Sequence, residues 1–383
     1  MTCHVKHATP QALRFLDAAL ADLRQQDLLR ERPTASETST RTSFCSNDYL
    51  GLASRPAPSH PAGAGASRLI SGERPEHVQV ERLAADLVGL PEALAFTSGY
   101  AANVGTLAAL AKAGDLIVSD AFNHASLIDG ARLSRARVEV VPHLDVEAVQ
   151  RALDLPRSGR AFVVTESYFS MDADAPDLMS LRRQCDAHDA ALVVDEAHAL
   201  GVLGPGGRGL CIEQEVRPDV LIGTFGKAFG AAGAFVAGCP SLVSWLWNRA
   251  RTFVFSTGMS PAVAVAAAEG IRIATKHPEL RKRALDAAAR MRLRLSELGI
   301  EPEGFGHIIP WIIGDARRAL DIASLVRAQG IDVRAVRPPS VPEGTARLRL
   351  TVTAAHDDKD IDKAVEAINR ALQNVGSPRA GAE

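Results

Sequence analysis

The stretch VVDEAHALG, residues 193–201, ends an apolar run at Asp195 and places His198 just ahead of a glycine-rich loop. It is one of a series of short apolar runs that alternate with helical segments: DLIVSD (115–120), VEVVP (138–142), AFVVTES (161–167), ALVVDE (191–196), VLIGTF (220–225) and AGAFVAG (232–238). Continuous apolar strands separated by helices are typical of a mainly parallel sheet that is covered on both faces. The sequence therefore predicts an α/β fold.

The pattern changes near the end of the chain, which indicates a second domain. The 383 residues exceed the roughly 250–300 at which a single hydrophobic core stops growing. After an alanine-rich helix at 260–276, strand-like HIIPWIIG (307–314), IDVRAV (331–336) and RLRLTV (347–352) are separated and followed by helical segments. We predict an N-terminal helix and connecting segment (1–45), a large domain (46–270) and a small α+β domain (271–383). The first helix would start at Thr9-Pro10, and its apolar positions would be Leu13, Phe15, Leu16, Leu20 and Leu23.

Composition excludes several classes of partner. The 43 basic and 45 acidic side chains give a net charge of −2, so nothing favours binding to a nucleic acid backbone. No apolar run approaches membrane-spanning length, and the N-terminus lacks the apolar core of a signal peptide. The five cysteines are scattered and odd in number, which is typical of a reduced cytoplasmic compartment.

Three motifs resemble functional sites, but each lacks its context. Asp-Glu-Ala-His (195–198) spells a helicase box, yet a phosphate loop needs G-x-x-x-x-G-K-[ST], and Gly226-Lys227 is followed by Ala228. The eleven histidines include no H-E-x-x-H or comparable ligand set, so we predict no metal site. The loop 204–209 matches G-x-G-x-x-G, but eight residues separate it from Asp195 and no clear helix follows. A nicotinamide-dependent oxidoreductase using this loop remains the alternative from another class.

Lys227, in TFGKAFG (224–230), combines with two other features to indicate pyridoxal 5′-phosphate (PLP) chemistry. SGYAAN (98–103) is a small-residue turn opening into a helix, which offers free backbone N–H groups to a phosphate, and Thr224 adds a hydroxyl. Asp195 at its strand end would keep the pyridine nitrogen protonated, while Lys227 would bond to the aldehyde. Separately, Lys227 is an ordinary surface lysine and Asp195 an ordinary helix cap; their co-occurrence favours PLP.

With these residues the chain resembles the α-oxoamine synthases, which are PLP enzymes of fold type I. The resemblance runs from about Asp27 to His356 through motifs in the family's order: SNDYLGL (46–52), GAGASRLISG (63–72), FTSGYAAN (96–103), SDAFNHASLIDG (119–130), SYFSMDADAPDL (167–178), DEAHALGVLGPGGRG (195–209), TFGKAFG (224–230) and RPPSVPEGTARLRLT (337–351). Two departures are a shorter, proline-rich 53–62 segment and Ala173 in place of a more usual glycine.

The resemblance implies a role for each matching residue. Lys227 would hold the cofactor covalently and then remove the substrate's α-proton, and Asp195 would pair with the pyridine nitrogen. His198 and Ser170 would bind the ring's phenolic oxygen, and His124 would stack on the ring and help the decarboxylation. The remaining positions would bind the phosphate (Gly99, Tyr100, Thr224, and Ser256 or Thr257 of a second subunit), the amino-acid carboxylate (Asn47, Arg349) and the acyl substrate (Arg30).

Some of these positions also have simpler explanations. His124 within NHAS could be a helix-start residue that bonds locally, and Asn47 could belong to a plain turn. Arg347 and Arg349 alternate along a strand, so we expect one of them to face solvent, while Arg349 and Thr351 share a face.

The resemblance also implies a substrate branch and an assembly. RPPSVP (337–342) is similar to the branch that condenses L-alanine with a pimeloyl thioester, with coenzyme A and an acyl carrier protein both open as carriers. Another α-oxoamine synthase, such as one acting on glycine and acetyl-CoA or one with a specialised acyl chain, stays an alternative. So does a PLP-fold module kept for binding or regulation. A homodimer is implied by the family and by symmetry precedent.

Overall fold

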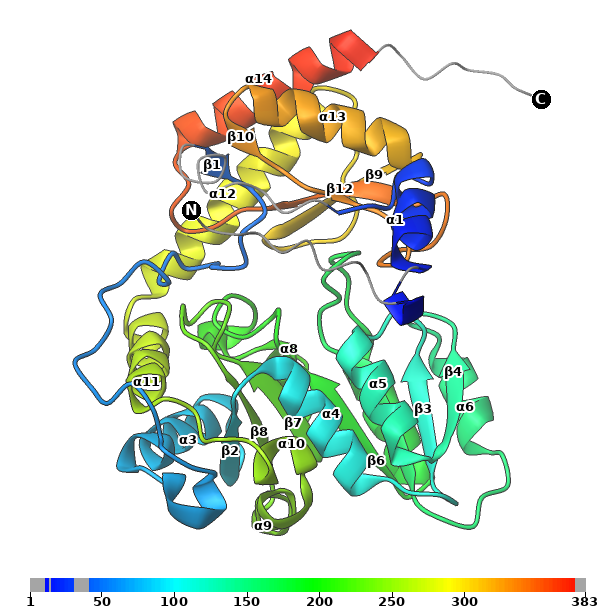
Figure 1. The fold of residues 1–383 in the computed structure, drawn as a ribbon, viewed down its shortest axis with the longest axis vertical. Helices are drawn as coiled ribbons and strands as arrows, with labels where there is room; N and C mark the ends of the chain where they lie inside the picture. The colour runs from blue at the N-terminus through cyan, green and yellow to red at the C-terminus, as the bar shows by residue number, and fades with distance from the viewer. Residues whose placement is uncertain (1–10, 14, 31–40, 376–383) are drawn as a thin grey trace.

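The computed structural model describes residues 11–13, 15–30 and 41–375, and its helices and strands form a larger and a smaller layered part (Figure 1). The strands are β1 (Thr42–Ser43), β2 (Glu92–Phe96), β3 (Leu116–Asp120), β4 (Arg137–Val141), β5 (Ala161–Glu166), β6 (Ala190–Asp195), β7 (Val220–Thr224), β8 (Ala234–Gly238), β9 (Ile308–Gly314), β10 (Ile331–Asp332), β11 (Ala335–Val336) and β12 (Ala346–Thr351). The α-helices are α1 (Phe15–Gln25), α3 (Pro75–Val88), α4 (Gly99–Leu110), α5 (Ala125–Ser134), α6 (Val146–Leu153), α7 (Leu178–Ala187), α8 (Leu210–Glu213), α9 (Pro240–Arg249), α10 (Arg251–Val254), α11 (Pro261–Lys276), α12 (Pro278–Ser296), α13 (Ala316–Ala328) and α14 (Asp358–Val375).

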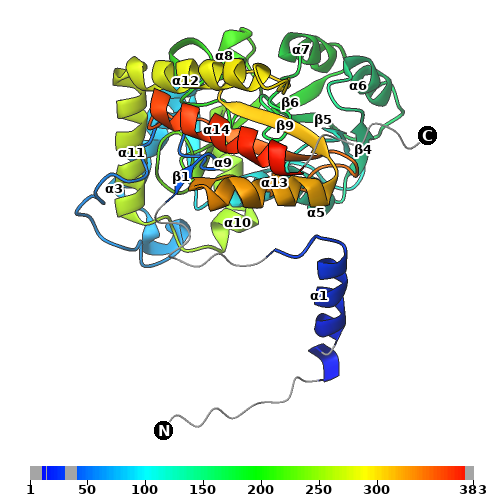
Figure 2. The ribbon, with the colours of Figure 1, turned by 90° about the horizontal axis from the view of Figure 1, so that it is seen from above.

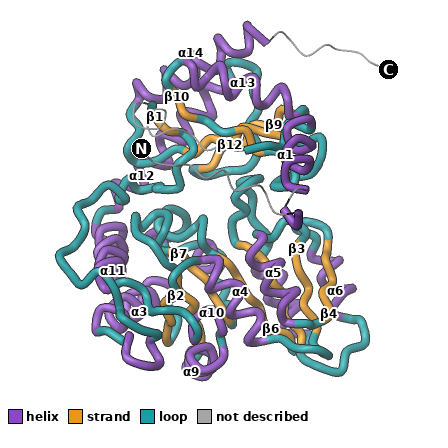
Figure 3. Tube along the Cα trace, in the orientation of Figure 1, coloured by secondary structure: helices purple, strands orange, loops and turns teal. Residues whose placement is uncertain are grey.

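The larger part is built on a seven-stranded sheet in the order β2-β8-β7-β6-β5-β3-β4 (Figure 3). Strands β7, β6, β5, β3 and β4 pair in parallel, and β8 is antiparallel to both of its neighbours. The mainly parallel sheet predicted from the apolar runs is therefore confirmed. The edge strand β2, which the sequence did not suggest, continues the sheet beyond β8.

Alternate side chains of the central strands enter two different cores, one on each face of the sheet. Leu192 and Val194 of β6 belong to the core that includes residues of α3, α6, α7 and α11, whereas Val193 belongs to the core that includes residues of α4, α5, α9 and α10. Two buried faces explain why these strands are apolar throughout rather than alternating.

The same alternation places polar strand ends together. Glu166, Asp195 and Thr224 end the adjacent strands β5, β6 and β7. By the two-residue period each faces the side of the sheet that α4 and α5 cover. Ligands of open α/β sheets bind outside these carboxyl ends.

The smaller part has its own core beneath α12, α13 and α14. Its sheet is antiparallel in the order β11-β12-β9, and β1 adds a short parallel pairing with β10. Phe44, which follows β1, is fully buried in this core. The N-terminal connection is thus fastened to the C-terminal part, although the boundaries drawn at residues 45 and 270 stay predictions.

The helix predicted near the N-terminus is α1, while Thr9-Pro10 lies outside the described residues. No α1 side chain is buried, and the helix projects away from the rest of the chain (Figure 2). Its predicted apolar positions (Leu13 in the preceding turn, Phe15, Leu16, Leu20 and Leu23) are all exposed. Residues 53–62 form a loop, as their proline content indicated.

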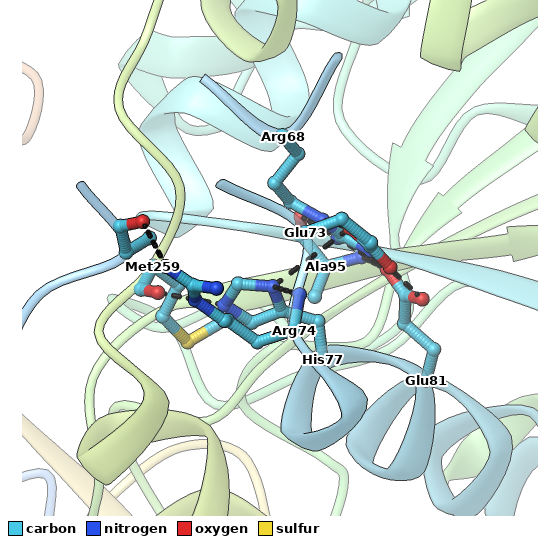
Figure 4. Close-up of polar contacts among 8 residues, drawn as sticks. Arg68, Glu73, Arg74, His77, Glu81, Ala95 and Met259 are labelled. Atoms are coloured by element: carbon cyan, nitrogen blue, oxygen red, sulfur yellow. Dashed lines mark hydrogen bonds and ion pairs between the residues drawn. The ribbon is translucent and has the colours of Figure 1, made fainter. Parts of the chain in front are cut away.

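A buried ion cluster joins the start of α3 to the sheet (Figure 4). The Arg68 guanidinium, from the 63–72 motif, contacts carboxylate oxygens of Glu73 and Glu81 at 2.5 Å each. Glu81 also accepts a bond from the Ala95 N–H of β2 at 2.7 Å. The Arg68 guanidinium lies 5.2 Å from the Trp247 ring centroid. Each charge in this cluster has its partners within the protein.

Candidate active site

The N-terminus of α4 is the predicted phosphate-binding end. Ser98 caps the helix by accepting a bond from the Ala101 N–H at 3.1 Å. The N–H groups of the first turn point out of the end of the helix, as in any α-helix. A Cβ built on Gly99 would lie 4.0 Å from Thr224 Oγ1, which places this turn beside the end of β7. Thr224 Oγ1 is held by the Gly226 N–H at 3.1 Å and the Gly233 carbonyl at 3.0 Å.

Tyr100, the other residue predicted at this end, is half exposed, and its hydroxyl donates to the Asp129 carboxylate. Its backbone N–H belongs to the first helical turn. Any contact of Tyr100 with a phosphate in this arrangement would therefore come from the backbone or from a ring edge.

Asp195 is a buried carboxylate fixed from two sides. Asn103 of α4 donates to Oδ2 at 2.7 Å, and the Ala197 N–H donates to Oδ1 at 2.9 Å. Asn103 also donates to Ser126 Oγ at 2.9 Å. The carboxylate is thus oriented on the face of the sheet that the predicted phosphate site occupies.

Glu166 is a second carboxylate beside Asp195, paired with it in register across β5 and β6. Burial and then the charge of Asp195 raise the Glu166 pKa to about 8. Glu166 Oε1 accepts the His124 N–H at 2.7 Å. Sequence reasoning missed this residue, although its place at the end of a strand next to Asp195 was an available signal.

Lys227 lies in the turn after β7, in the electrostatic field of both carboxylates. Burial lowers its pKa to about 8, an effect that Asp195 and Glu166 oppose and Arg349 reinforces. An ammonium that loses its proton near neutral pH can act as a nucleophile and as a base.

Two histidines lie close to this amine. His124 caps α5, with Nδ1 2.7 Å from Ser126 Oγ. The local bonding suggested for a helix-start residue is therefore present, yet His124 also lies near Asp195 and Lys227. Burial and Lys227 lower the His124 pKa, and Asp195 partly offsets them. Burial, with Lys227 and Arg349, holds the His198 pKa well below its usual value.

The predicted carboxylate site is a buried guanidinium with one free arm. Arg349 donates to the Ser170 carbonyl at 2.5 Å, to Asn47 Oδ1 at 3.2 Å and to Thr351 Oγ1 at 3.1 Å. Its Nη2 is buried and has no hydrogen-bond partner among residues 11–13, 15–30 and 41–375. An orphaned guanidinium arm matches a carboxylate ligand.

One expectation about this strand is wrong. Arg347 does not face solvent, because it is 2% exposed and binds Asp172 Oδ1 at 2.6 Å and the Met171 carbonyl at 2.9 Å. Both arginines are buried because residues two apart share one face of a strand, and loop 170–172 of the larger part covers that face of β12. The shared face of Arg349 and Thr351 is confirmed.

Three other predicted residues lie farther out. Arg30 is exposed and donates to Ser340 Oγ at 3.2 Å, in the RPPSVP loop. Ser256 and Thr257 follow α10 and line a small cavity with Arg68 and Thr97.

The glycine loop 204–209 packs against its own chain. A Cβ on Gly209 would lie 2.0 Å from Glu196 Oε2, and one on Gly204 would lie 2.0 Å from the Gly209 carbonyl oxygen. Glu196 accepts the Cys211 N–H at 2.6 Å. These glycines are required by packing, which removes the support for a dinucleotide loop.

Comparison with known proteins agrees with this geometry. The model of the family "Aminotransferase class I and II" matches residues 40–368. An 8-amino-7-oxononanoate synthase of Anaeromyxobacter dehalogenans is 43% identical over 88% of this chain and 89% of its own length. One of Bordetella petrii is 42% identical over 94% and 98%. The chain belongs to the 8-amino-7-oxononanoate synthase family.

Solved structures place this family member among fold-type I PLP enzymes. Serine palmitoyltransferase from S. paucimobilis, solved with a PLP–myriocin aldimine, has a TM-score of 0.87 at 26% identity, covering 96% of this chain and 99% of that one. The 8-amino-7-oxononanoate synthase of Francisella tularensis has a TM-score of 0.74 at 26% identity, covering 88% and 98%. The predicted fold type and cofactor are confirmed.

The residues present suit PLP. A lysine with a lowered pKa, a buried carboxylate held by Asn103, and a glycine-opened helix end beside Thr224 provide partners for an aldehyde, a pyridinium and a phosphate. Among the described residues no group of three or more His, Cys, Asp or Glu could hold a metal ion, and no helix is long and apolar enough to cross a bilayer.

Proposed function

We propose that this chain condenses L-alanine with a pimeloyl thioester to give 8-amino-7-oxononanoate, carbon dioxide and a free thiol, the reaction of biotin synthesis. A carbon–carbon bond forms between the alanine Cα and the thioester carbonyl. The thiol leaves, and the carbon dioxide comes from the alanine carboxylate. The observation that carries the proposal is the free arm of Arg349 in the same buried site as the near-neutral amine of Lys227.

When bound, PLP supplies the electron sink that makes loss of the alanine α-proton feasible. Lys227 in its neutral form would hold the aldehyde and would accept the α-proton. Asp195, oriented by Asn103, would accept a hydrogen bond from the protonated pyridine nitrogen. Arg349 and Asn47 bind the amino-acid carboxylate and so fix which Cα bond faces the base.

The other residues have supporting roles. His124, at the start of α5, would stack on the ring and assist the loss of carbon dioxide. The His198 imidazole and the Ser170 hydroxyl would bind the phenolic oxygen. Gly99, Tyr100 and Thr224 would bind the phosphate, while Arg30 on its exposed segment would meet the acyl substrate.

The chain would form a homodimer in the cytoplasm. The dimer is supported by the exposed apolar residues of α1 and by Phe255, which is 72% exposed beside Ser256 and Thr257. The hydroxyls of Ser256 or Thr257 would reach the partner's phosphate site. Sedimentation over a range of concentrations tests this assembly, and a stable monomer with full activity would refute it.

The substrate branch is tested by a matrix of amino acids and acyl thioesters. L-Alanine, glycine and L-serine are each combined with pimeloyl, acetyl and long-chain thioesters of coenzyme A, and with pimeloyl-carrier protein. Release of carbon dioxide is expected to be fastest with alanine and a pimeloyl donor. Turnover confined to glycine with acetyl-CoA, or to another acyl chain, would assign the chain to another α-oxoamine branch.

A further inference from the structure

The Tyr49 hydroxyl lies between His198 and the candidate carboxylate site. The Tyr49 side chain is fully buried, and its hydroxyl lies 2.6 Å from His198 Nδ1 and 3.2 Å from Asn47 Oδ1. Asn47 Oδ1 also accepts from Arg349 Nη1 at 3.2 Å. Asn47 Oδ1 and His198 Nδ1 are therefore two competing acceptors for the single proton of the Tyr49 hydroxyl.

The single proton of the Tyr49 hydroxyl decides the tautomer of His198. A neutral imidazole carries its proton on one nitrogen, and the partner of the other nitrogen selects which. The shorter of the two Tyr49 contacts is the one to Nδ1, so the hydroxyl donates there and the His198 proton resides on Nε2. Burial keeps both groups neutral, because it raises the Tyr49 pKa to about 12 and lowers the His198 pKa.

His307 keeps the Tyr49 ring in place. The two rings meet edge to face with centroids 4.1 Å apart. His307 is fully buried, and within the described part of the chain neither of its ring nitrogens has a hydrogen-bond partner. Burial lowers its pKa to about 3, so it packs as an uncharged wall.

We propose that Tyr49 is a positioning residue that fixes His198 as the Nε2–H tautomer by donating its single hydroxyl proton to Nδ1. With the cofactor bound, the Nε2–H group would be the donor available to the phenolic oxygen, which rests on the function proposed above. A carboxylate that binds Arg349 would change how strongly Asn47 Oδ1 competes for the Tyr49 proton. The strength of the Tyr49–His198 bond would change with it.

The main variant is Tyr49→Phe, which keeps the ring and removes only the hydroxyl. A donor at the phenolic oxygen withdraws electron density from the ring and so lowers the pH at which the Lys227-linked nitrogen loses its proton. In the cofactor-loaded Tyr49→Phe protein we expect the pH midpoint of the visible absorption band to rise by roughly half a unit or more. The charged and titratable groups that face this network and Lys227 are His124, Asp195, Glu166, His307 and Arg349.

Tyr168→Phe is the matched control. Tyr168 is 1% exposed, its ring lies 5.6 Å from that of His307, and its hydroxyl donates to the Phe305 carbonyl rather than to a histidine. It loses a buried hydroxyl bond of the same kind, so a general loss of packing would move both midpoints. We expect the Tyr168→Phe midpoint to match that of the wild type.

A double-mutant cycle tests whether Tyr49 acts through His198. If it does, His198→Asn alone and the Tyr49→Phe/His198→Asn double variant should show the same midpoint. Additive shifts, or a Tyr49→Phe midpoint equal to that of Tyr168→Phe, would overturn the proposal. If the wild type shows no visible band with PLP, the proposed function fails instead, so the two failures are distinguishable.

A fluorine probe covers the case in which Tyr49→Phe does not fold. The chain has three tyrosines, so 3-fluorotyrosine gives three resonances, which Tyr100→Phe and Tyr168→Phe assign by elimination. His198→Asn in the cofactor-loaded protein should shift the Tyr49 resonance and leave that of Tyr168 in place. An unmoved Tyr49 resonance would contradict the bond on which the inference rests.

Discussion

Two buried charge clusters in this molecule contain similar residues but differ in how completely they are paired. Around Arg68, two carboxylates, a backbone N–H and aromatic faces satisfy the charges within the protein. Around Lys227 and Arg349, one guanidinium nitrogen lacks a partner within the described residues, and the lysine gives up its proton easily. A saturated cluster stabilises the fold, whereas an incomplete one is free to bind a ligand.

The largest expected effect is at the amine of the incomplete cluster. Lys227→Ala should abolish the visible band of bound PLP and lower turnover by roughly 10³-fold or more, because it removes both the covalent anchor and the base. Absorbance and carbon dioxide release measure the two losses. Lys276→Ala, at an exposed lysine, is the control; a yellow, active Lys227→Ala protein would contradict the assignment.

The saturated cluster should respond in stability instead. Arg68→Met leaves Glu81 buried without its cation and should cost about 3–5 kcal/mol of unfolding free energy. Chemical denaturation measures this loss. Arg370→Met, which breaks the exposed pair with Glu366 at 3.0 Å, should stay within about 0.5 kcal/mol of the wild type. Equal effects in the two variants would remove the distinction between the clusters.

Arg349 and Arg347 show the same contrast within one strand. Arg349 has a nitrogen without a partner among the described residues, whereas Arg347 is bonded within the protein. Arg349→Lys keeps the charge but loses the planar fork, so the KM for L-alanine should rise about tenfold. Arg347→Lys, whose partners are Asp172 and the Met171 carbonyl, should lower Tm and leave KM nearly unchanged. Steady-state kinetics and thermal melts of both variants separate binding from stability.

A smaller effect concerns pH. The neutral amine is the nucleophile, so the rate of PLP attachment to the cofactor-free protein should rise with pH and level off above about 8, the pKa of Lys227. Stopped-flow absorbance measures this rate. Glu166→Gln removes a charge that raises this pKa, so the levelling point should move to lower pH. A rate that still rises toward pH 10 would mean that Lys227 has the pKa of an ordinary lysine.

Local signals were sufficient to predict the sheet and the ends of its strands. Apolar runs locate the strands from β3 to β8, and a polar residue at a strand end is visible in sequence, as for Asp195 and Thr224. Lys227 was found because it follows such a strand between glycines. Each of these features depends on residues close together in the chain.

What sequence could not provide are the contacts between distant segments. Asn103 orients Asp195 from another element 92 positions away, and Tyr49 reaches His198 across 149 positions. The burial of Arg347 depends on a loop 175 positions earlier, so the expectation that one of the two arginines faces solvent was wrong. Periodicity groups the residues of one element on a face and carries no information on what covers that face.

The most direct test of the central claim is to reduce the PLP-loaded protein with borohydride and map the modified peptide by mass spectrometry. The account predicts a single reduced pyridoxyl group on Lys227, and its absence from the Lys227→Ala protein. Modification of another lysine, or none at all in a protein that binds PLP and turns over, would contradict it.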